Sequence, residues 1–306
     1  MPNPLVSVLM PAFNAEKYIA LAIKSILEQT LSDFELIIFN DGSTDSTAEV
    51  IADVCDNRIV LIESKCNVGL VEARNILVSR ARGRYIAFLD ADDIAMPGRL
   101  MAQVAFLDGQ QVDICGSNYL SFYEATGKIK TSNQRHSDAD IRALLTIFSP
   151  LCNPSVMGKS EVFRRFPYQL GIDYAEDYSL WVKMALAGYR FANLKEALIT
   201  YRVHPKQTSQ KQNKELSAIF SRSRQEYLGG LGIPPKLTPV AMGFNDRLNL
   251  ALPFMLELNQ KISGISVMAN YEIYARFQFR GNGLMTPLTR LERLLVAICA
   301  SIKGVV

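Results

Sequence analysis

The chain has 306 residues, of which 49% are hydrophobic and 21% charged, a balance typical of a folded protein with a sizeable core. The length allows about two domains, and the composition excludes global disorder, collagen and coiled coil. A net charge of +3 is too small for a dedicated nucleic-acid-binding protein. Five cysteines without CxxC spacing and two histidines form neither a zinc motif nor a disulfide framework, which favours a reducing compartment.

The N-terminal segment carries no positively charged stretch, and Pro11 interrupts its apolar run, so we expect no signal peptide. No run reaches the ~18 apolar residues that a membrane-spanning helix needs. We therefore expect a cytoplasmic protein, either free or bound peripherally to the inner face of the cytoplasmic membrane.

Residues 1–115 alternate short aliphatic runs with amphipathic helical patterns, which is typical of βαβ units and a parallel sheet. We expect strands at 5–10, 34–39, 58–62 and 85–89. Asn14 is expected to cap the helix after the first strand, and either Ser43 or Asp45 the helix after the second. Pro97 is expected to open the helix after the fourth strand.

Residues 116–205 are more mixed, and we expect them to complete the same domain. The pattern predicts a strand at 112–115, a helix near 139–148 and a further helix after Ala175. The segment KQTSQKQNKE then reads as a polar linker, and the sequence beyond it carries helical patterns without clear strands. We therefore divide the chain into a domain of two halves, 1–115 and 116–205, and a helical extension, 206–306.

Polar residues follow three of the expected strands at their carboxyl ends. Asn14 follows the first strand, Asp41 the second, and Asp90 and Asp92 the fourth. Ligands of open α/β sheets bind beyond the carboxyl ends of the strands. The pattern therefore predicts one shared crevice.

Asp90 and Asp92 are two residues apart, so their carboxylates project to the same side of an extended backbone. They suit a Mg²⁺ or Mn²⁺ ion whose shell is completed by a diphosphate, or alternatively form a solvated acidic turn. Asp41 has two interpretations as well: it accepts hydrogen bonds from a nucleotide base, or it caps the next helix.

Two later segments also permit a functional and a structural interpretation. Glu176 and Asp177 begin a helix, where carboxylates either complement the helix dipole or supply a general base. His204 is either structural or, together with Arg202, a contact for phosphate or metal.

Taken together, these segments resemble a known family. VSVLMPAFN, SILEQTLSDFELIIFNDGSTDST, NVGLVEARN, GRYIAFLDADD with MPGRL, AEDYSLW and TYRVH occur in this order between about residues 5 and 205. They resemble the motifs of the inverting nucleotide-sugar glycosyltransferases of family 2. The resemblance implies a GT-A fold, which is a Rossmann-like α/β fold whose mixed, mainly parallel sheet is flanked by helices, followed here by the helical extension.

The resemblance implies a role for each matching residue. Asp177 is implied as the catalytic base with Glu176 beside it, and Asp92, Asp90 and His204 as contacts of a Mn²⁺ or Mg²⁺ ion. Asp41 is implied to recognise the base, usually uracil, although Asn40 stands where members often have another aspartate. The implied nucleotide-sugar contacts are Pro11, Ala12, Phe13, Asn14, Asp41, Arg74, Asp90, Ala91, Asp92 and Arg202.

The implied reaction is a single displacement, in which a hydroxyl of a glycan or lipid-linked acceptor attacks the sugar of a donor, expected to be a UDP-sugar. The expected destination is a bacterial surface polysaccharide or another glycan, with no nucleic acid involved. One alternative is a nucleotide-sugar-binding assembly subunit without transferase activity, and another is a metal-dependent nucleotidyltransferase. The latter is disfavoured because MPAFNAEKY is not a glycine-rich, basic phosphate loop.

The C-terminal residues carry the positive charge of the chain. From residue 215 onward there are 10 Lys and Arg against 6 Asp and Glu. After Thr286 and Pro287, six aliphatic residues form one helical stripe: Leu288, Leu291, Leu294, Leu295, Ile298 and Ile302. We expect this stripe either to lie on an anionic membrane surface or to contact protein, including a second subunit.

Overall fold

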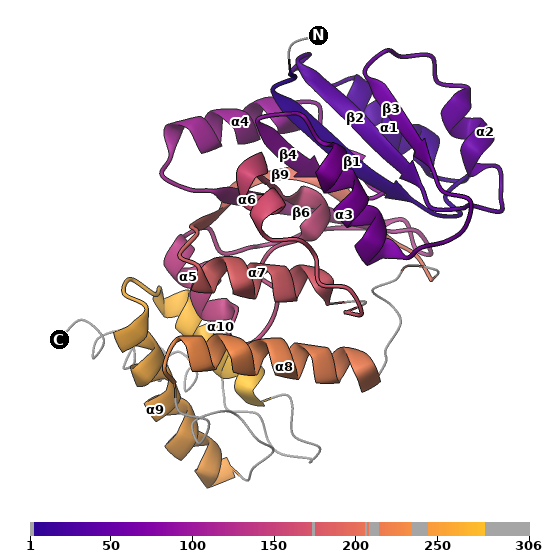
Figure 1. The fold of residues 1–306 in the computed structure, drawn as a ribbon. Helices are drawn as coiled ribbons and strands as arrows, with labels where there is room; N and C mark the ends of the chain where they lie inside the picture. The colour runs from indigo at the N-terminus through magenta and orange to yellow at the C-terminus, as the bar shows by residue number, and fades with distance from the viewer. Residues whose placement is uncertain (1–2, 173–174, 206, 208–213, 234–243, 279–306) are drawn as a thin grey trace.

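The computed structural model describes residues 3–172, 175–205, 207, 214–233 and 244–278 (Figure 1). The strands are β1 (Val6–Ala12), β2 (Phe34–Asn40), β3 (Ile59–Glu63), β4 (Tyr85–Phe88), β5 (Ile94–Ala95), β6 (Ile114–Tyr123), β7 (Lys128–Thr131), β8 (Met157–Lys159) and β9 (Phe191–Val203). The helices are α1 (Ile19–Leu27), α2 (Thr47–Ala52), α3 (Leu70–Arg80), α4 (Arg99–Gly109), α5 (Asp138–Leu144), α6 (Ser160–Arg165), α7 (Glu176–Leu186), α8 (Lys214–Gly230), α9 (Phe244–Lys261) and α10 (Val267–Gln278), with a 3₁₀ turn at Asn153–Ser155.

All these strands form one mixed sheet in the order β3-β2-β1-β4-β8-β6-β9-β5, with β7 paired to β6. The first four strands in this order are parallel. The short strand β8 runs antiparallel to both β4 and β6, and β9 is parallel to β6 and antiparallel to β5. The predicted α/β fold with a mixed sheet is confirmed.

The residues of each central strand alternate between two cores, one on each face of the sheet. In β1, Val8 and Met10 face one core and Leu9 faces the other, as the two-residue period of a strand requires. Helices α1, α2 and α4 bury their apolar residues in the first core, and α3, α6 and α7 in the second. Both faces of the sheet are therefore covered (Figure 1), which leaves the strand ends as the place where polar side chains gather.

The four expected N-terminal strands are present, with ends within two residues of the predicted ones. The strand expected at 112–115 is instead the longer β6, because it pairs with β9 along its whole length and forms a hairpin with β7. The helix expected near 139–148 is the shorter α5. Helix α4 begins at Arg99, two residues after the expected Pro97.

The prediction that Asn14 caps a helix is wrong, because α1 begins only at Ile19. Asn14 has a φ of 49°, a left-handed conformation that asparagine tolerates better than most residues. Its Oδ1 accepts a hydrogen bond from Thr44 N at 2.8 Å, and its own N–H donates to Ser43 Oγ at 3.0 Å. Asn14 therefore ties the loop after β1 to the loop after β2. Helix α2 has Ser46 at its N-cap, not Ser43 or Asp45.

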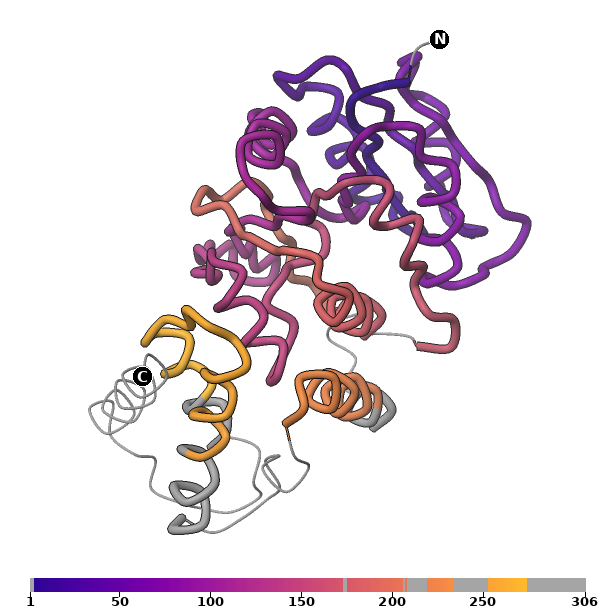
Figure 2. Tube along the Cα trace, turned by 60° about the vertical axis from the view of Figure 1, so that its left-hand side comes forward, coloured from indigo at the N-terminus to yellow at the C-terminus, as the bar shows by residue number. Residues whose placement is uncertain are grey.

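The C-terminal helices α8, α9 and α10 lie on the α5 and α7 side of the sheet, away from its β3 edge (Figures 1 and 2). Tyr178 of α7 stacks on Phe220 of α8 with ring centroids 4.8 Å apart. Buried residues of α5, including Leu144, share a third core with α8, α9 and α10. The helical stripe expected after Thr286 lies outside the described residues. Of the helices that the structure describes, none is long and apolar enough to cross a membrane.

Candidate active site

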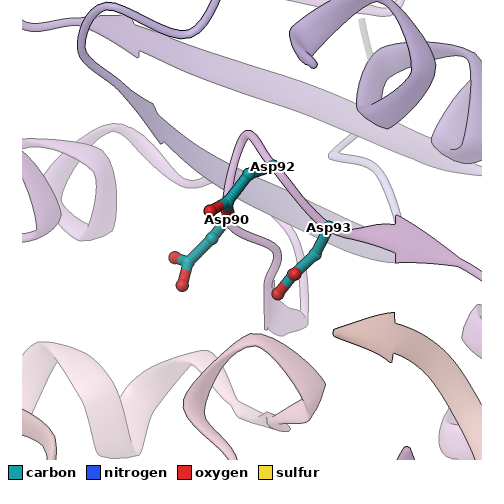
Figure 3. Close-up of side chains that lie close together, drawn as sticks. All are labelled: Asp90, Asp92 and Asp93. Atoms are coloured by element: carbon teal, nitrogen blue, oxygen red, sulfur yellow. The ribbon is translucent and has the colours of Figure 1, made fainter. Parts of the chain in front are cut away.

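The short turn between β4 and β5 contains three aspartates: Asp90, Asp92 and Asp93 (Figure 3). One carboxylate oxygen of each lies within 4.8 Å of the corresponding oxygens of the other two. Asp93 is completely buried, and its Oδ2 has no hydrogen-bond partner among the described residues. Ala91, between them, is buried as well. The carboxyl end of β4 thus gathers three anionic groups in one small volume.

The charges of these aspartates are costly in this surrounding. Burial raises the pKa of Asp90 and holds that of Asp93 well above its ordinary value, and the carboxylate of Asp92 adds to both shifts. A divalent cation would offset this cost, and hard cations prefer oxygen ligands of this kind. The close carboxylates of Asp90 and Asp92, with the unpartnered Asp93 Oδ2 beside them, therefore fit a Mg²⁺ or Mn²⁺ ion.

Two side chains from the end of β9 meet this cluster. His204 Nε2 lies 2.9 Å from Asp92 Oδ2. Arg202 donates from its backbone N–H to Asp93 Oδ1 at 2.8 Å and from its Nε to the Asp92 carbonyl at 3.0 Å. The strand pair between β5 and β9 brings them here, since Ile94 pairs with Thr200. His204 and Arg202, which were expected to contact phosphate or metal, thus lie beside the aspartates.

A buried guanidinium connects the aspartate cluster to the start of α7. Arg74 of α3 forms an ion pair with Glu176, and its Nη2 lies 3.4 Å from Asp90 Oδ1. Its guanidinium also lies 5.6 Å from the ring centre of Tyr168. The side chains of Arg74 and Glu176 are 4% and 6% exposed, so this pair is almost completely shielded from water. Arg74 thereby fixes Glu176, and with it the first turn of α7, beside Asp90.

Asp177 is only partly buried and follows Glu176 in the first turn of α7. Its Oδ1 accepts a hydrogen bond from Tyr178 N at 2.6 Å. Burial raises the pKa of Asp177 to about 7, and the Glu176 carboxylate adds to the rise, while Arg74 opposes it. A carboxyl with a pKa near neutrality suits proton transfer at physiological pH.

The other expected contacts lie at the ends of β1 and β2. The buried carboxylate of Asp41 accepts hydrogen bonds from Val68 N at 2.7 Å and Gly69 N at 3.0 Å, so it orders the loop before α3 instead of capping α2. Each of its oxygens retains a second lone pair for another donor. Asp41 N donates to Ala12 O at 2.8 Å. Pro11 is half-buried and Phe13 is 48% exposed, so the Phe13 ring is available to a ligand.

The structure thus divides the expected residues into two groups. One group lies at the ends of β1 and β2: Pro11, Ala12, Phe13, Asn14 and Asp41. The other group consists of the aspartate turn and its neighbours: Arg74, Asp90, Ala91, Asp92, Glu176, Asp177, Arg202 and His204.

Sequence reasoning missed two residues that support the second group, Tyr18 and Tyr168. Both contact the guanidinium of an expected site residue, Tyr18 that of Arg202 and Tyr168 that of Arg74. A tyrosine in a helical or loop pattern carries no signal for this role. The third aspartate of the DADD run, Asp93, was visible in the sequence, but its contact with Arg202 N was not.

Comparison with known proteins places the chain among glycosyltransferases. The family model described as "Glycosyl transferase family 2" matches residues 7–168. An uncharacterized glycosyltransferase of Haemophilus influenzae is 34% identical over 258 residues, which cover 76% of this chain and 77% of that protein. The Escherichia coli protein WfaP, a "UDP-Glc:alpha-D-GlcNAc-diphosphoundecaprenol beta-1,3-glucosyltransferase", is 33% identical over 213 residues, which cover 69% of this chain and 82% of WfaP.

Solved structures show the same fold at low sequence identity. Staphylococcus aureus TarS 1–349 in complex with UDP-GlcNAc superposes with a TM-score of 0.61 at 14% identity, covering 97% of this chain and 90% of that chain. The mannosyltransferase PcManGT from Pyrobaculum calidifontis, in complex with GDP-Man and Mn²⁺, gives a TM-score of 0.54 at 17% identity, covering 100% of this chain and 88% of that one.

Proposed function

The chain belongs to glycosyl transferase family 2, and we propose that it transfers a sugar from a UDP-sugar to a hydroxyl of a glycan or lipid-linked acceptor. The product would be part of a bacterial surface polysaccharide. A UDP-sugar donor is supported by the name of WfaP and by the UDP-GlcNAc complex of TarS. Membership of an enzyme family argues against both the assembly subunit and the nucleotidyltransferase.

One observation carries this proposal: Arg74 contacts both Asp90 and Glu176. The residues expected to bind the donor and the residue expected to act as base come from separate parts of the chain. The Arg74 contacts hold the aspartate turn and the first turn of α7 next to each other. An acceptor hydroxyl beside Asp177 would then lie close to a donor held at the aspartates, and such proximity supplies much of the rate enhancement of an enzyme.

In the proposed reaction, the Asp177 carboxylate removes the proton of the acceptor hydroxyl. The oxygen attacks the anomeric carbon of the donor sugar, and the bond from that carbon to the diphosphate breaks. The electron pair leaves with UDP, and the configuration at the anomeric carbon inverts. Glu176 is engaged by Arg74, so we assign it to holding the helix start, and Asp177 to the proton transfer.

Asp90, Asp92 and His204 would hold a Mn²⁺ or Mg²⁺ ion, which when bound neutralises charge on the departing diphosphate. Arg202 would donate hydrogen bonds to phosphate oxygens from the rest of its guanidinium, since its Nε donates to the Asp92 carbonyl and so holds the guanidinium beside the aspartate turn. Phe13 and Asp41, at the ends of β1 and β2, would bind the uracil base. Residues 1–205 would form the catalytic domain, and residues 206–306 the helical extension.

The first test is thermal unfolding of the protein with UDP, GDP and their sugar conjugates, each with and without Mn²⁺. Ligands that bind only the folded state raise the unfolding temperature. We expect stabilisation by UDP and by one UDP-sugar, and a larger effect with Mn²⁺ that is lost in Asp92→Asn. Preference for GDP would overturn the assignment of the base, and the absence of any nucleotide effect would overturn the donor site.

The second test is transfer itself, with the UDP-sugar identified in this way and a GlcNAc-diphosphate lipid as acceptor. We expect release of UDP together with one new glycosidic bond. A nucleotidyltransferase would instead release no UDP and, with added inorganic diphosphate, would convert the UDP-sugar to UTP and the sugar 1-phosphate. Binding of the UDP-sugar without turnover with any acceptor would favour the binding subunit.

A further inference from the structure

Residues from two distant loops meet next to Arg202 and His204. Lys17 and Tyr18 belong to the segment between β1 and α1, and Glu124 follows β6. The Tyr18 hydroxyl donates to Glu124 Oε2 at 2.9 Å, and Lys17 forms an ion pair with the same carboxylate. The segment between β1 and α1 is thus joined to the residue that follows β6.

The ring of Tyr18 contacts both functional side chains of β9. The Arg202 guanidinium lies 4.8 Å from the centre of the Tyr18 ring and 5.4 Å from that of Phe122. The Tyr18 and His204 ring centroids are 5.0 Å apart, with an angle of 42° between the ring planes. Cation–π contacts at these distances favour one orientation of the guanidinium. The ring of Tyr18 thus touches both Arg202 and His204.

We propose that Tyr18 is a positioning residue that holds Arg202 and His204 in their binding orientation through its ring, and that Glu124 fixes this ring by accepting the hydrogen bond of its hydroxyl. The inference rests on the proposed donor site and adds to it a residue outside the matched motifs. Tyr18 itself has no direct role in the chemistry. It acts through Arg202 on the diphosphate and through His204 on the metal ion.

The ring and the hydroxyl make separable contributions. The ring makes the contacts with Arg202 and His204, whereas the hydroxyl binds Glu124. Lys17 contributes little to the position of Glu124 and the Tyr18 ring, because its side chain is 65% exposed and surface ion pairs of this kind are weak. Removal of the ring should therefore weaken binding more than removal of the hydroxyl alone.

The test compares Tyr18→Met and Tyr18→Phe with the control Tyr123→Met. Tyr123 is a tyrosine of β6 whose ring contacts Lys130. Its neighbour Phe122 contacts Arg202, and successive side chains of a strand point to opposite faces, so the control makes the same chemical change on the opposite face of β6. The full-length proteins are titrated with Mn²⁺ in the presence of UDP, with free Mn²⁺ followed by electron paramagnetic resonance. Thermal unfolding reports whether each variant is folded.

We expect Tyr18→Met to raise the dissociation constant for Mn²⁺ about tenfold, Tyr18→Phe by less than about threefold, and Tyr123→Met not at all. Equal constants for Tyr18→Met and Tyr123→Met would overturn the inference. So would an effect of Tyr18→Phe as large as that of Tyr18→Met, because the hydroxyl would then be responsible. If Tyr18→Met does not fold, Tyr18→Leu replaces it with the same expected rise in the dissociation constant, and a constant equal to that of the wild type there refutes the proposal.

The wild-type titration separates this inference from the proposed function. If the wild-type protein binds neither UDP nor Mn²⁺, the donor site itself is wrong. If it binds both and the Tyr18 variants bind equally well, the donor site stands and the role of Tyr18 is refuted.

Discussion

Replacement of Asp177 by Asn should separate catalysis from both donor binding and stability. Asn has nearly the same shape and its Oδ1 can still accept the hydrogen bond from Tyr178 N, but it cannot take the acceptor's proton. Loss of a general base lowers turnover by about 10²–10⁴-fold. We expect this loss in kcat, while the dissociation constant for UDP with Mn²⁺ changes by less than about threefold.

The same substitution should stabilise the protein, and more so at high pH. The pKa of Asp177 is raised from 3.8 to about 7 in the folded state, so its ionisation opposes folding. The resulting loss of unfolding free energy is absent below about pH 4, grows between pH 4 and 7, and is complete above pH 7. At 1.36 kcal/mol per pKa unit its upper limit is about 4 kcal/mol, and partial exposure of the side chain reduces this to ~2 kcal/mol.

The assay is urea unfolding of wild type and Asp177→Asn at pH 5 and pH 8, with Asp53→Asn as control. Asp53 is an exposed aspartate at the end of α2, where the same change should alter the free energy of unfolding by less than about 0.5 kcal/mol. The gain from Asp177→Asn should be larger at pH 8 than at pH 5. A gain that is equal at both values, or a loss at pH 8, would refute the reasoning about burial.

Four further predictions concern Asp177, Glu176 and Gly42. In the wild type, kcat/KM should rise with pH through an ionisation near pH 7. A kcat/KM that has already reached its plateau at pH 5 would contradict the raised pKa of Asp177. Glu176→Gln should lower the free energy of unfolding by about 3 kcal/mol in urea, since it weakens the buried pair with Arg74, whereas the exposed control Glu161→Gln should not. Glu176→Gln should also move the rise of kcat/KM to lower pH, because it removes the carboxylate that raises the pKa of Asp177. A shift of this rise to higher pH would contradict repulsion between the two carboxylates. Gly42→Ala should lower the unfolding temperature, because Gly42 has a φ of 64° and a Cβ there would lie 2.6 Å from the carbonyl carbon of Cys66.

The strands of the N-terminal half could be predicted because each is a short aliphatic run, and the polar residues that follow them could be assigned to one edge because parallel strands end together. The same pattern could not give the length of β6. The five residues of its second half are all only partly buried, and this half is held as a strand by pairing with β7 and β9. Asn14 was misassigned because a left-handed loop residue and a helix cap use the same short polar side chain.

The contacts that organise the site were beyond sequence reasoning because they join distant parts of the chain. Arg74 and Glu176 are 102 residues apart, and Tyr18 and Glu124 are 106 apart. No local pattern encodes which of many arginines meets which carboxylate across the sheet. The sequence could therefore nominate Asp90, Asp92 and Asp177 one by one, whereas their connection through Arg74 required the fold.

The contact between α7 and α8 constrains how this protein can be recombined with its relatives. Tyr178, the neighbour of Asp177, stacks on Phe220 of the C-terminal helices, and Asp140 of α5 accepts hydrogen bonds from both the N–H and the hydroxyl of Ser266 before α10. A chimera joined at residue 205 would replace Phe220 and Ser266 but keep their partners. Exchange of the C-terminal helices would therefore have to carry the facing residues of α5 and α7 with it, so that the packing behind Asp177 is preserved.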